Sequence, residues 1–366
     1  MDKDGKCVVF PLAQMGLDPA QINIANHLKS AGYKTACIGK WHLGDRPQFL
    51  PTRQGFDYFY GLPYSNDTDS LFSQKYNFDR IFPEIPLMRG EEKIEVPVNQ
   101  NTLTQRYTAE AVRFIRKNRN KPFFLYLPHT MPHKPPHASE QFRGVSANGL
   151  YGDAVEEIDW SAGEIIKTVT DLGLEKNTLL LFTSDNGASQ WVQANRGSNL
   201  PLRGWKGSTL EGGMRVPFIA RWPGTIPEGC VNRELATTMD FLPTIASLAA
   251  APLPAGHVID GKDIWPLLKN QLHAKSEYEA FYYYLRDQLQ AVRHGQWKLH
   301  LPLQRMNSGC WNFDENPRKA ELYDLSKDLG ETKNIAGNHP EIVEKLLILA
   351  DVARRDLGDR NREGKN

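Results

Sequence analysis

The chain has 366 residues and carries 44 Lys and Arg against 43 Asp and Glu, for a formal net charge of +1 at pH 7. Its length is enough to bury a large core and predicts two domains. Because the opposite charges nearly cancel, the composition argues against a nucleic-acid-binding protein. No apolar run reaches the roughly 18 residues that a membrane-spanning helix needs, and no apolar stretch typical of a signal peptide follows residues 1–6.

The four cysteines, Cys7, Cys37, Cys230 and Cys310, lie far apart and form no CxxC or Cys/His cluster. This spacing argues against a zinc site or a redox motif and leaves disulfide pairing open. The sequon Asn66-Asp67-Thr68 would matter only in a protein secreted from a eukaryote.

The first predicted elements are a helix and a strand. Asp18-Pro19-Ala20-Gln21 has the pattern of a helix start, with Asp at the N-cap, Pro in the first turn and Gln closing a capping box. We therefore expect a helix over 19–31, ended by Gly32, and then a strand over 33–38. In the loop that follows, Lys40 and His42 form either part of a site or a solvated cation beside a packed histidine.

Segment 45–100 is rich in Pro, Asp, Asn and aromatic residues and has little periodicity. Long irregular segments of compact domains are usually functional or disordered, and the aromatic content argues against disorder. We expect an ordered rim that shapes a substrate pocket. The aromatic residues are Phe56, Tyr58, Phe59, Tyr60 and Tyr64.

A second helix is predicted over 104–119 and a buried strand over 122–127. The strand runs into a proline-rich loop that cannot be helical and that carries His129, His133 and His137. Histidines in such a rigid loop can bind anions or move protons. The alternative is a surface loop with incidental histidines.

The longest predicted helix covers 153–172 and leads into a strand over 178–183 that we expect to be buried. This alternation of helix and strand favours a mostly parallel sheet. The strand ends in Ser184-Asp185-Asn186-Gly187, so it places a carboxylate and a carboxamide where α/β sheets bind ligands. Two adjacent oxygen ligands suit Ca²⁺ or Mg²⁺, although Asp-Asn-Gly is also common turn chemistry.

A glycine-rich stretch over 203–217 carries Lys206 between flexible turns. Glycines let the backbone approach a ligand closely, and Lys206 could reach an anion as a point charge or simply be solvated. The spacing is not that of a P-loop. A strand over 218–222 and a helix over 238–250 follow; beyond about residue 270, strands over 281–285, 290–293 and 296–300 and a helix over 340–357 predict a small α+β domain.

The candidate residues after the predicted strands can converge on one sheet edge. One divalent cation site, two lysines and two histidines would neutralise a compact anion with several oxygens and protonate a leaving oxygen. This chemistry indicates hydrolysis or transfer of a sulfate or a phosphate ester and does not choose between them. The residues are Lys40, His42, His133, Asp185, Asn186 and Lys206.

Four stretches resemble signature segments of the type I, formylglycine-dependent sulfatases, in the family's order and spacing. They are Gly39–Gly44, Pro132–Pro135, Ser184–Gly187 and Lys206–Gly213. Leu322–Leu325, with Asp328–Glu331 and Asn334, resembles the motif that closes their C-terminal domain.

This resemblance extends from about residue 8 to about residue 350. It implies an alkaline-phosphatase-like α/β fold, a mixed and mostly parallel sheet flanked by helices, with a smaller antiparallel α+β C-terminal domain. The expected domains are an N-terminally incomplete catalytic domain over 1–270 and a sheet-plus-helix domain over 271–366.

The resemblance also implies roles for single residues. Lys40 resembles the lysine that contacts the nucleophile and the sulfate, and His42 the base that helps to expel sulfate from a covalent intermediate. His133 and Lys206 resemble the pair that binds sulfate oxygens and assists the leaving alcohol.

The resemblance also implies residues that bind the metal and residues that contact the substrate. Asp185 and Asn186 resemble ligands of Ca²⁺, with Mg²⁺ less favoured. Ser65 stands where some members place another sulfate contact, and His300 is a further candidate.

The sequence departs from the family at the nucleophile. The family makes formylglycine from the Cys or Ser of a C/S-x-P-x-R motif, and this sequence contains none. The early strand whose two aspartates complete the Ca²⁺ shell is also missing. We expect a fragment of an active enzyme, or a truncated gene product, with negligible sulfatase activity as it stands.

Two alternatives remain: a catalytically inactive protein that binds sulfated glycans, and a phosphate or phosphonate ester hydrolase of the same superfamily. The expected partner is a sulfated small molecule or glycan, with no nucleic acid. The family resemblance indicates a periplasmic, extracellular or lysosomal location, and the oligomeric state stays open.

Overall fold

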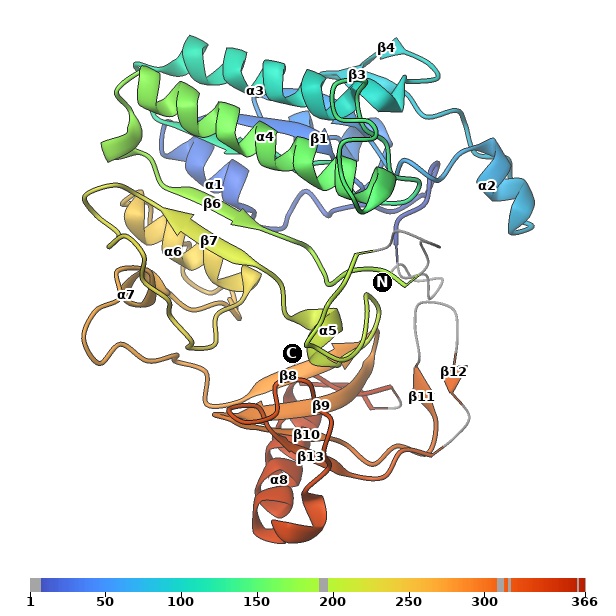
Figure 1. Cartoon of the computed structure of the whole chain (residues 1–366), viewed down its shortest axis with the longest axis vertical. Coiled ribbons are helices and arrows are strands. Elements are labelled where there is room, and N and C mark those ends of the chain that lie inside the picture. Colours follow the sequence, from blue (N-terminus) through green and yellow to red (C-terminus); the bar gives the residue numbers. More distant parts are fainter. Residues whose placement is uncertain (1–7, 191–196, 308–312, 315–316, 361, 366) are drawn as a thin grey trace.

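The computed structural model describes residues 8–190, 197–307, 313–314, 317–360 and 362–365. Figure 1 shows an α/β region that carries the first two thirds of the chain and an antiparallel sheet with a helix at the other end. This is the predicted fold class, a mixed sheet flanked by helices followed by a separate antiparallel sheet.

The larger sheet has five strands in the order β4-β3-β2-β1-β5. Strand β1 pairs in parallel with β2 on one side and with the edge strand β5 on the other, while β3 and β4 add antiparallel. The bounds are β1 Lys34–Lys40, β2 Tyr58–Leu62, β3 Leu87–Arg89, β4 Glu92–Glu95 and β5 Phe123–Tyr126.

Helices cover both faces of this sheet because successive side chains of a strand point to opposite sides. Ala36 and Ile38 of β1 lie in one apolar cluster with Tyr107 of α3 (Leu103–Asn118). Cys37, between them, lies in another cluster with Ala25 of α1 (Ile24–Ser30). The long helix α4 (Gly149–Asp171) packs beside α3 (Figure 1).

The strand β6 (Leu180–Thr183) pairs antiparallel with β7 (Phe218–Arg221), and the two form a sheet of their own. The expectation of a buried strand before Asp185 is therefore wrong. All four residues of β6 are half-buried, because among the described residues neither β6 nor β7 pairs with the five-stranded sheet.

The C-terminal sheet is antiparallel throughout, in the order β13-β10-β9-β8. Its bounds are β8 Phe281–Leu285, β9 Gln288–His294, β10 Trp297–His300 and β13 Glu321–Asp324. Helix α8 (Pro340–Asp356) packs on it around Leu299, Leu322 and Leu346, all of them buried. This apolar cluster is separate from the other two, and the domain boundary near residue 270 stays a prediction.

The remaining elements are short. They are α2 Ser70–Lys75, α5 Glu211–Met214, α6 Phe241–Leu248, α7 Trp265–Leu268, β11 Met306–Asn307 and β12 Phe313–Asp314, with 3₁₀ turns at Pro47–Phe49, Pro51–Arg53, Gln100–Thr102, Glu175–Asn177, Thr238–Asp240 and Ala336–Asn338. None of the helices in the described residues is long and apolar enough to cross a membrane.

The predicted start of the first helix is wrong. Asp18 closes a turn, since its carbonyl accepts the Gln21 amide at 3.0 Å. The helix begins six residues later, where Asn23 and Asn26 bond each other's backbone in a capping box at 2.9 and 3.0 Å. Two patterns compete here, and the reciprocal bonds of the second satisfy more backbone donors.

The interpretation of segment 45–100 as an irregular rim is also wrong in part, because this segment contains three strands. Phe59 and Tyr60 belong to β2 and are buried, as are Phe56 and Tyr64. These aromatic side chains therefore build the core beneath the site and do not line its rim.

Candidate active site

The site forms where the parallel strands β1, β2 and β5 end together. The Lys40 amide donates to the Pro128 carbonyl at 2.7 Å, and the His42 amide donates to the Pro63 carbonyl at 3.1 Å. Glycine makes this approach possible: a Cβ on Gly39 would lie 2.0 Å from the Pro128 oxygen, and a Cβ on Gly61 would lie 1.8 Å from the Gly39 oxygen. The loops that follow β1, β2 and β5 therefore begin close to one another.

His133 is held by groups from the loop after β2. Its Nδ1 faces the Asn66 Oδ1 at 3.1 Å and the Lys134 carbonyl at 3.0 Å, with the Ser65 Oγ at 3.5 Å. Because a carbonyl oxygen only accepts, Nδ1 carries the hydrogen. The other ring nitrogen, Nε2, is thereby left to exchange protons.

The side chain of Asn66 has one orientation open to it. Its Nδ2 donates to the Gln100 Oε1 at 3.0 Å and to the Pro135 carbonyl at 3.2 Å, which turns Oδ1 toward His133. Asn66 is buried, so the nitrogen that glycosylation would modify is already engaged. The sequon is therefore part of the site's support.

Two lysines, two histidines and two aspartates interact electrostatically at this site. Burial lowers the pKa of Lys40, with Asp185 and Asp67 opposing the shift and Lys206 adding to it. Burial likewise lowers the pKa of His42 to about 4, and the charge of Lys40 reinforces it. Both histidines and both lysines therefore lie within electrostatic reach of one another.

His133 follows the same pattern. Burial lowers its pKa to about 4 against the charge of Asp67, while Lys40 and Lys206 lower it further. Both imidazoles are consequently neutral at pH 7, which reduces the repulsion that two lysines would otherwise impose.

The loop after β6 lies against the loop that carries Lys206. The Lys206 amide donates to the Ala188 carbonyl at 3.0 Å, and the Gly187 amide donates to the Gly213 carbonyl at 3.1 Å. A Cβ on Gly187 would lie 1.8 Å from the Gly212 oxygen, so the glycines are needed for this contact. Lys206 itself is exposed, and Asp185 raises the pKa of Lys40 across the site.

Two buried polar atoms at the site lack a hydrogen-bond partner among the described residues, the Nε2 of His42 and the Oδ1 of Asn186. Such atoms cost free energy unless a ligand satisfies them. His42 also has a φ of 60°, a region that non-glycine residues rarely occupy. Both observations are typical of a ligand-binding site.

The structure brings together Lys40, His42, His133, Ser65, Lys206 and Asp185, and it keeps Asn186 beside Asp185. Of the three loop histidines, only His133 faces this group. His129 packs on Ser161 at 3.3 Å, and His137 contacts Asn101 at 2.9 Å.

The sequence predictions missed Asp67, whose Oδ1 lies 4.0 Å from the His133 Nδ1. Its charge acts on Lys40, His42 and His133. The signal was present, since an acidic residue soon after a strand is a typical site position. It was overlooked because β2 was not recognised as a strand.

Comparison with protein families and known proteins identifies the family to which this chain is related. The family model "Sulfatase" matches residues 10–251, and "N-sulphoglucosamine sulphohydrolase, C-terminal" matches residues 205–349. The chain belongs to the sulfatase family. It is 44% identical to the N-acetylgalactosamine-6-sulfatase of Mus musculus over 91% of this chain and 62% of that protein.

Two further sulfatases extend the likeness. Arylsulfatase A of Homo sapiens is 35% identical over 93% of this chain and 73% of its own length. The crystal structure of the PsFucS1 sulfatase from Pseudoalteromonas sp. superimposes with a TM-score of 0.81 at 27% identity, covering 94% of this chain and 75% of the other. The chain spans 53–62% of the N-acetylgalactosamine-6-sulfatases of mouse, dog and rat.

Sulfatases in general use a metal and a formylglycine. Asp185 and the unpartnered oxygen of Asn186 suit a hard cation, yet the described residues contain no group of three acidic, His or Cys side chains that could hold one. The sequence also has no C/S-x-P-x-R motif. Asp185 and Asn186 by themselves are too few ligands for such a cation, and without the motif no residue of this sequence can be assigned as the formylglycine precursor.

Proposed function

We propose that this chain carries the sulfate-binding and leaving-group side of a sulfate ester hydrolase site. The observation that supports this most is the convergence of Lys40, His42, His133 and Lys206 on one point, with neutral imidazoles and an unpartnered His42 Nε2. A site of this kind attracts an anion and supplies protons to it.

Each side chain has a distinct task in this proposal. Lys40 and Lys206 neutralise the oxygens of the sulfate group. His133 keeps its Nδ1 hydrogen on Asn66 and Lys134, so its Nε2 is the nitrogen that takes up a proton and can then pass it to the leaving alcohol. A bound anion raises the pKa of both histidines, which brings them toward their protonated forms.

We further propose a sulfated sugar as the substrate. Relatives that are 44% identical are named for N-acetylgalactosamine 6-sulfate. The periplasmic, extracellular or lysosomal location that the family resemblance implies agrees with such a substrate. Within this proposal Asp185 and Asn186 are two of the ligands of a divalent cation, Ca²⁺ before Mg²⁺.

Calorimetric titration with N-acetylgalactosamine 6-sulfate, an aryl sulfate and an aryl phosphate tests the proposal. We expect the sulfates to bind more tightly than the phosphate, and Lys206→Ala or His133→Ala to weaken sulfate binding by about tenfold or more. Lys333→Met, on the surface of the other region, is the matched control. Equal affinity in wild type and both site variants would contradict the proposal.

Sulfate release is measured on the same samples. Because the sequence has no formylglycine precursor motif, we expect release by the wild type to equal that of the His133→Ala, Lys206→Ala double variant. Release clearly above this control would show another nucleophile. Binding without release would favour the second candidate, a protein that binds sulfated glycans without cleaving them.

A further inference from the structure

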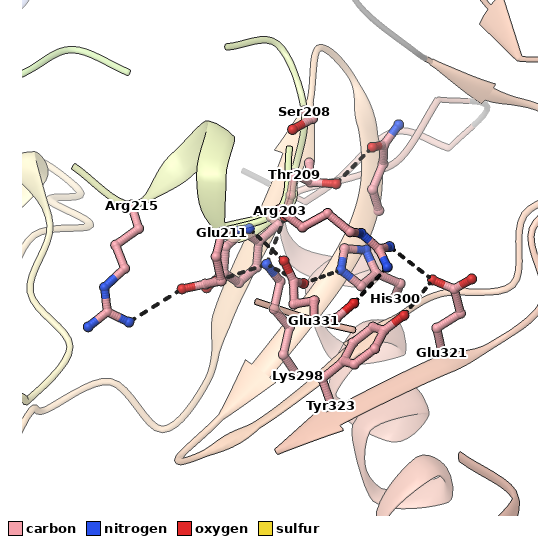
Figure 2. Close-up of polar contacts among 12 residues, drawn as sticks. Arg203, Ser208, Thr209, Glu211, Arg215, Lys298, His300, Glu321, Tyr323 and Glu331 are labelled. Atoms are coloured by element: carbon pink, nitrogen blue, oxygen red, sulfur yellow. Dashed lines mark hydrogen bonds and ion pairs between the residues drawn. The ribbon is translucent and has the colours of Figure 1, made fainter. Parts of the chain in front are cut away.

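A cluster of buried charges joins the Lys206 loop to the C-terminal sheet. Lys298, on β10, is fully buried, and its Nζ donates to the Thr209 carbonyl at 2.8 Å and to the Glu211 Oε1 at 2.9 Å. The same Nζ lies 3.1 Å from the Glu331 Oε1 and 4.2 Å from the centre of the Tyr283 ring. Figure 2 shows these side chains meeting between the loop and the sheet.

Glu331 holds the same loop from a second side. Its Oε2 accepts the Glu211 amide at 2.7 Å, and its carbonyl accepts from the Arg203 Nη1 at 2.6 Å. The His300 Nε2 donates to the Glu331 Oε1 at 2.6 Å, while the His300 Nδ1 receives Arg318 at 3.0 Å. Both nitrogens of His300 are thus engaged in this cluster, away from the candidate site.

The backbone of Glu331 adds an independent observation. Its φ is 53°, in the left-handed region that a glutamate rarely occupies. Such a conformation persists where the surrounding contacts impose it. Here it lets one residue bind the loop with its side chain and with its carbonyl at once.

Lys206 lies midway between the anchored residues Arg203 and Thr209. Within the loop the Gly212 amide donates to the Arg203 carbonyl at 2.7 Å, which closes the turn at its base. The chain around Lys206 is therefore fixed at Arg203, Thr209 and Glu211, and each of these three contacts a residue of the C-terminal region.

Replacing a buried ion cluster with apolar side chains is often neutral or stabilising, so such a cluster is weak evidence of a role in stability alone. We propose that the cluster of Lys298, Glu331 and Glu211 positions Lys206 for its anion, so that the C-terminal sheet sets the geometry of a site it does not enter. The contact between Lys206 and a sulfate rests on the proposed function. The positioning of the loop does not.

Hydrogen exchange on the ligand-free protein tests the positioning directly. In Lys298→Met, and in the isosteric variant Glu331→Gln, we expect the amides of Lys206 and Gly212 to exchange at least about tenfold faster than in wild type. The amides of β1 and α3 should keep their rates, as should all amides in the control Lys333→Met. Unchanged exchange in the loop, or equal acceleration throughout the chain, would overturn the proposal.

A thermodynamic cycle with inorganic sulfate tests the consequence for binding. We expect Lys298→Met to weaken sulfate binding about tenfold in the wild type and to have no further effect in the Lys206→Ala background, because it acts through that lysine. An equal loss in both backgrounds would contradict the positioning role. Failure of the wild type to bind sulfate would contradict the proposed function, while the exchange result still decides the positioning.

Discussion

Two clusters of charged residues in this protein have opposite character. Around Lys298 every charge has an opposite charge or hydrogen-bond partner, and the group is closed to solvent. Around Lys40 two lysines and two aspartates, all among the described residues, form no ion pair with one another, Lys206 is exposed and two buried polar atoms have no partner in the described chain. In the first cluster the charged groups find their partners within the protein. In the second, the unpartnered polar atoms gain partners only when a ligand binds.

The difference shows how the fold divides its tasks. A self-satisfied cluster can hold a loop in one place, since moving any member exposes a buried charge. A site with unsatisfied groups is costly in the free protein and gains free energy on binding. The four predictions below test this contrast, beginning with the largest expected effect.

Lys298→Met should lower the free energy of unfolding of the C-terminal region by about 3–5 kcal/mol, because it leaves Glu211 and Glu331 buried without their shared cation. Urea denaturation measures the change. Lys333→Met, an exposed site, should stay within about 0.5 kcal/mol of wild type. A loss in Lys298→Met as small as that of the control would remove the contrast between the two clusters.

Acid should weaken the closed cluster through Glu331. Burial by itself raises the pKa of this residue, but the hydrogen bond from His300 and the charge of Lys298 outweigh it and lower the pKa from 4.5 to about 2. The lowered pKa contributes about 3 kcal/mol to the free energy of unfolding. This contribution is present above pH 4.5 and is lost as the pH falls toward 2.

The measurement is the unfolding free energy of wild type and Glu331→Gln at several values of pH. The variant should be less stable near neutral pH and should lose less stability between pH 4.5 and pH 2. Parallel pH profiles would assign the acid sensitivity to other groups.

Lys206→Met should separate binding from stability at the open cluster. We expect inorganic sulfate to bind about 10- to 100-fold more weakly, since a charge-assisted hydrogen bond is worth about 1.5–3 kcal/mol. The ligand-free variant should be at least as stable as wild type because Lys206 is exposed and its charge acts against that of Lys40. Thermal unfolding with and without sulfate measures both effects, and only the wild type should gain a higher Tm from sulfate.

The smallest predicted effect is on the pH dependence of sulfate binding. His42 and His133 have a pKa of about 4 and are neutral at pH 7. A bound dianion favours their protonated forms, so the affinity should rise by about tenfold as the pH falls from 7 toward 4.5. His133→Gln should reduce this rise, and His137→Gln, which lies outside the group, should keep it.

Local patterns in the sequence were sufficient for the strongly periodic elements. Helices α3, α4 and α8 and the hairpin of β9 and β10 lie close to where hydrophobic spacing and turn residues predicted them. Four motifs also predicted that Lys40, His133, Asp185 and Lys206 lie together, and the structure brings them within electrostatic reach of one another. These signals are local because each depends on neighbours within a few residues.

Other features depended on contacts between distant segments. Strand β2 has no clear alternation because it lies buried beside β1, and without it neither Asp67 nor the orienting role of Asn66 could be foreseen. The separation of β6 and β7 from the larger sheet likewise follows from pairing, which local sequence does not encode.

By itself, the sequence predicted most of the side chains that the structure brings together, because their identities and order along the chain suffice to recognise the family. Only the tertiary structure decided how those side chains are held. Lys206 is fixed by Lys298 and Glu331, which lie about 90 and 125 residues further along the chain. Contacts over such separations form only when the two regions pack, and no local periodicity records them.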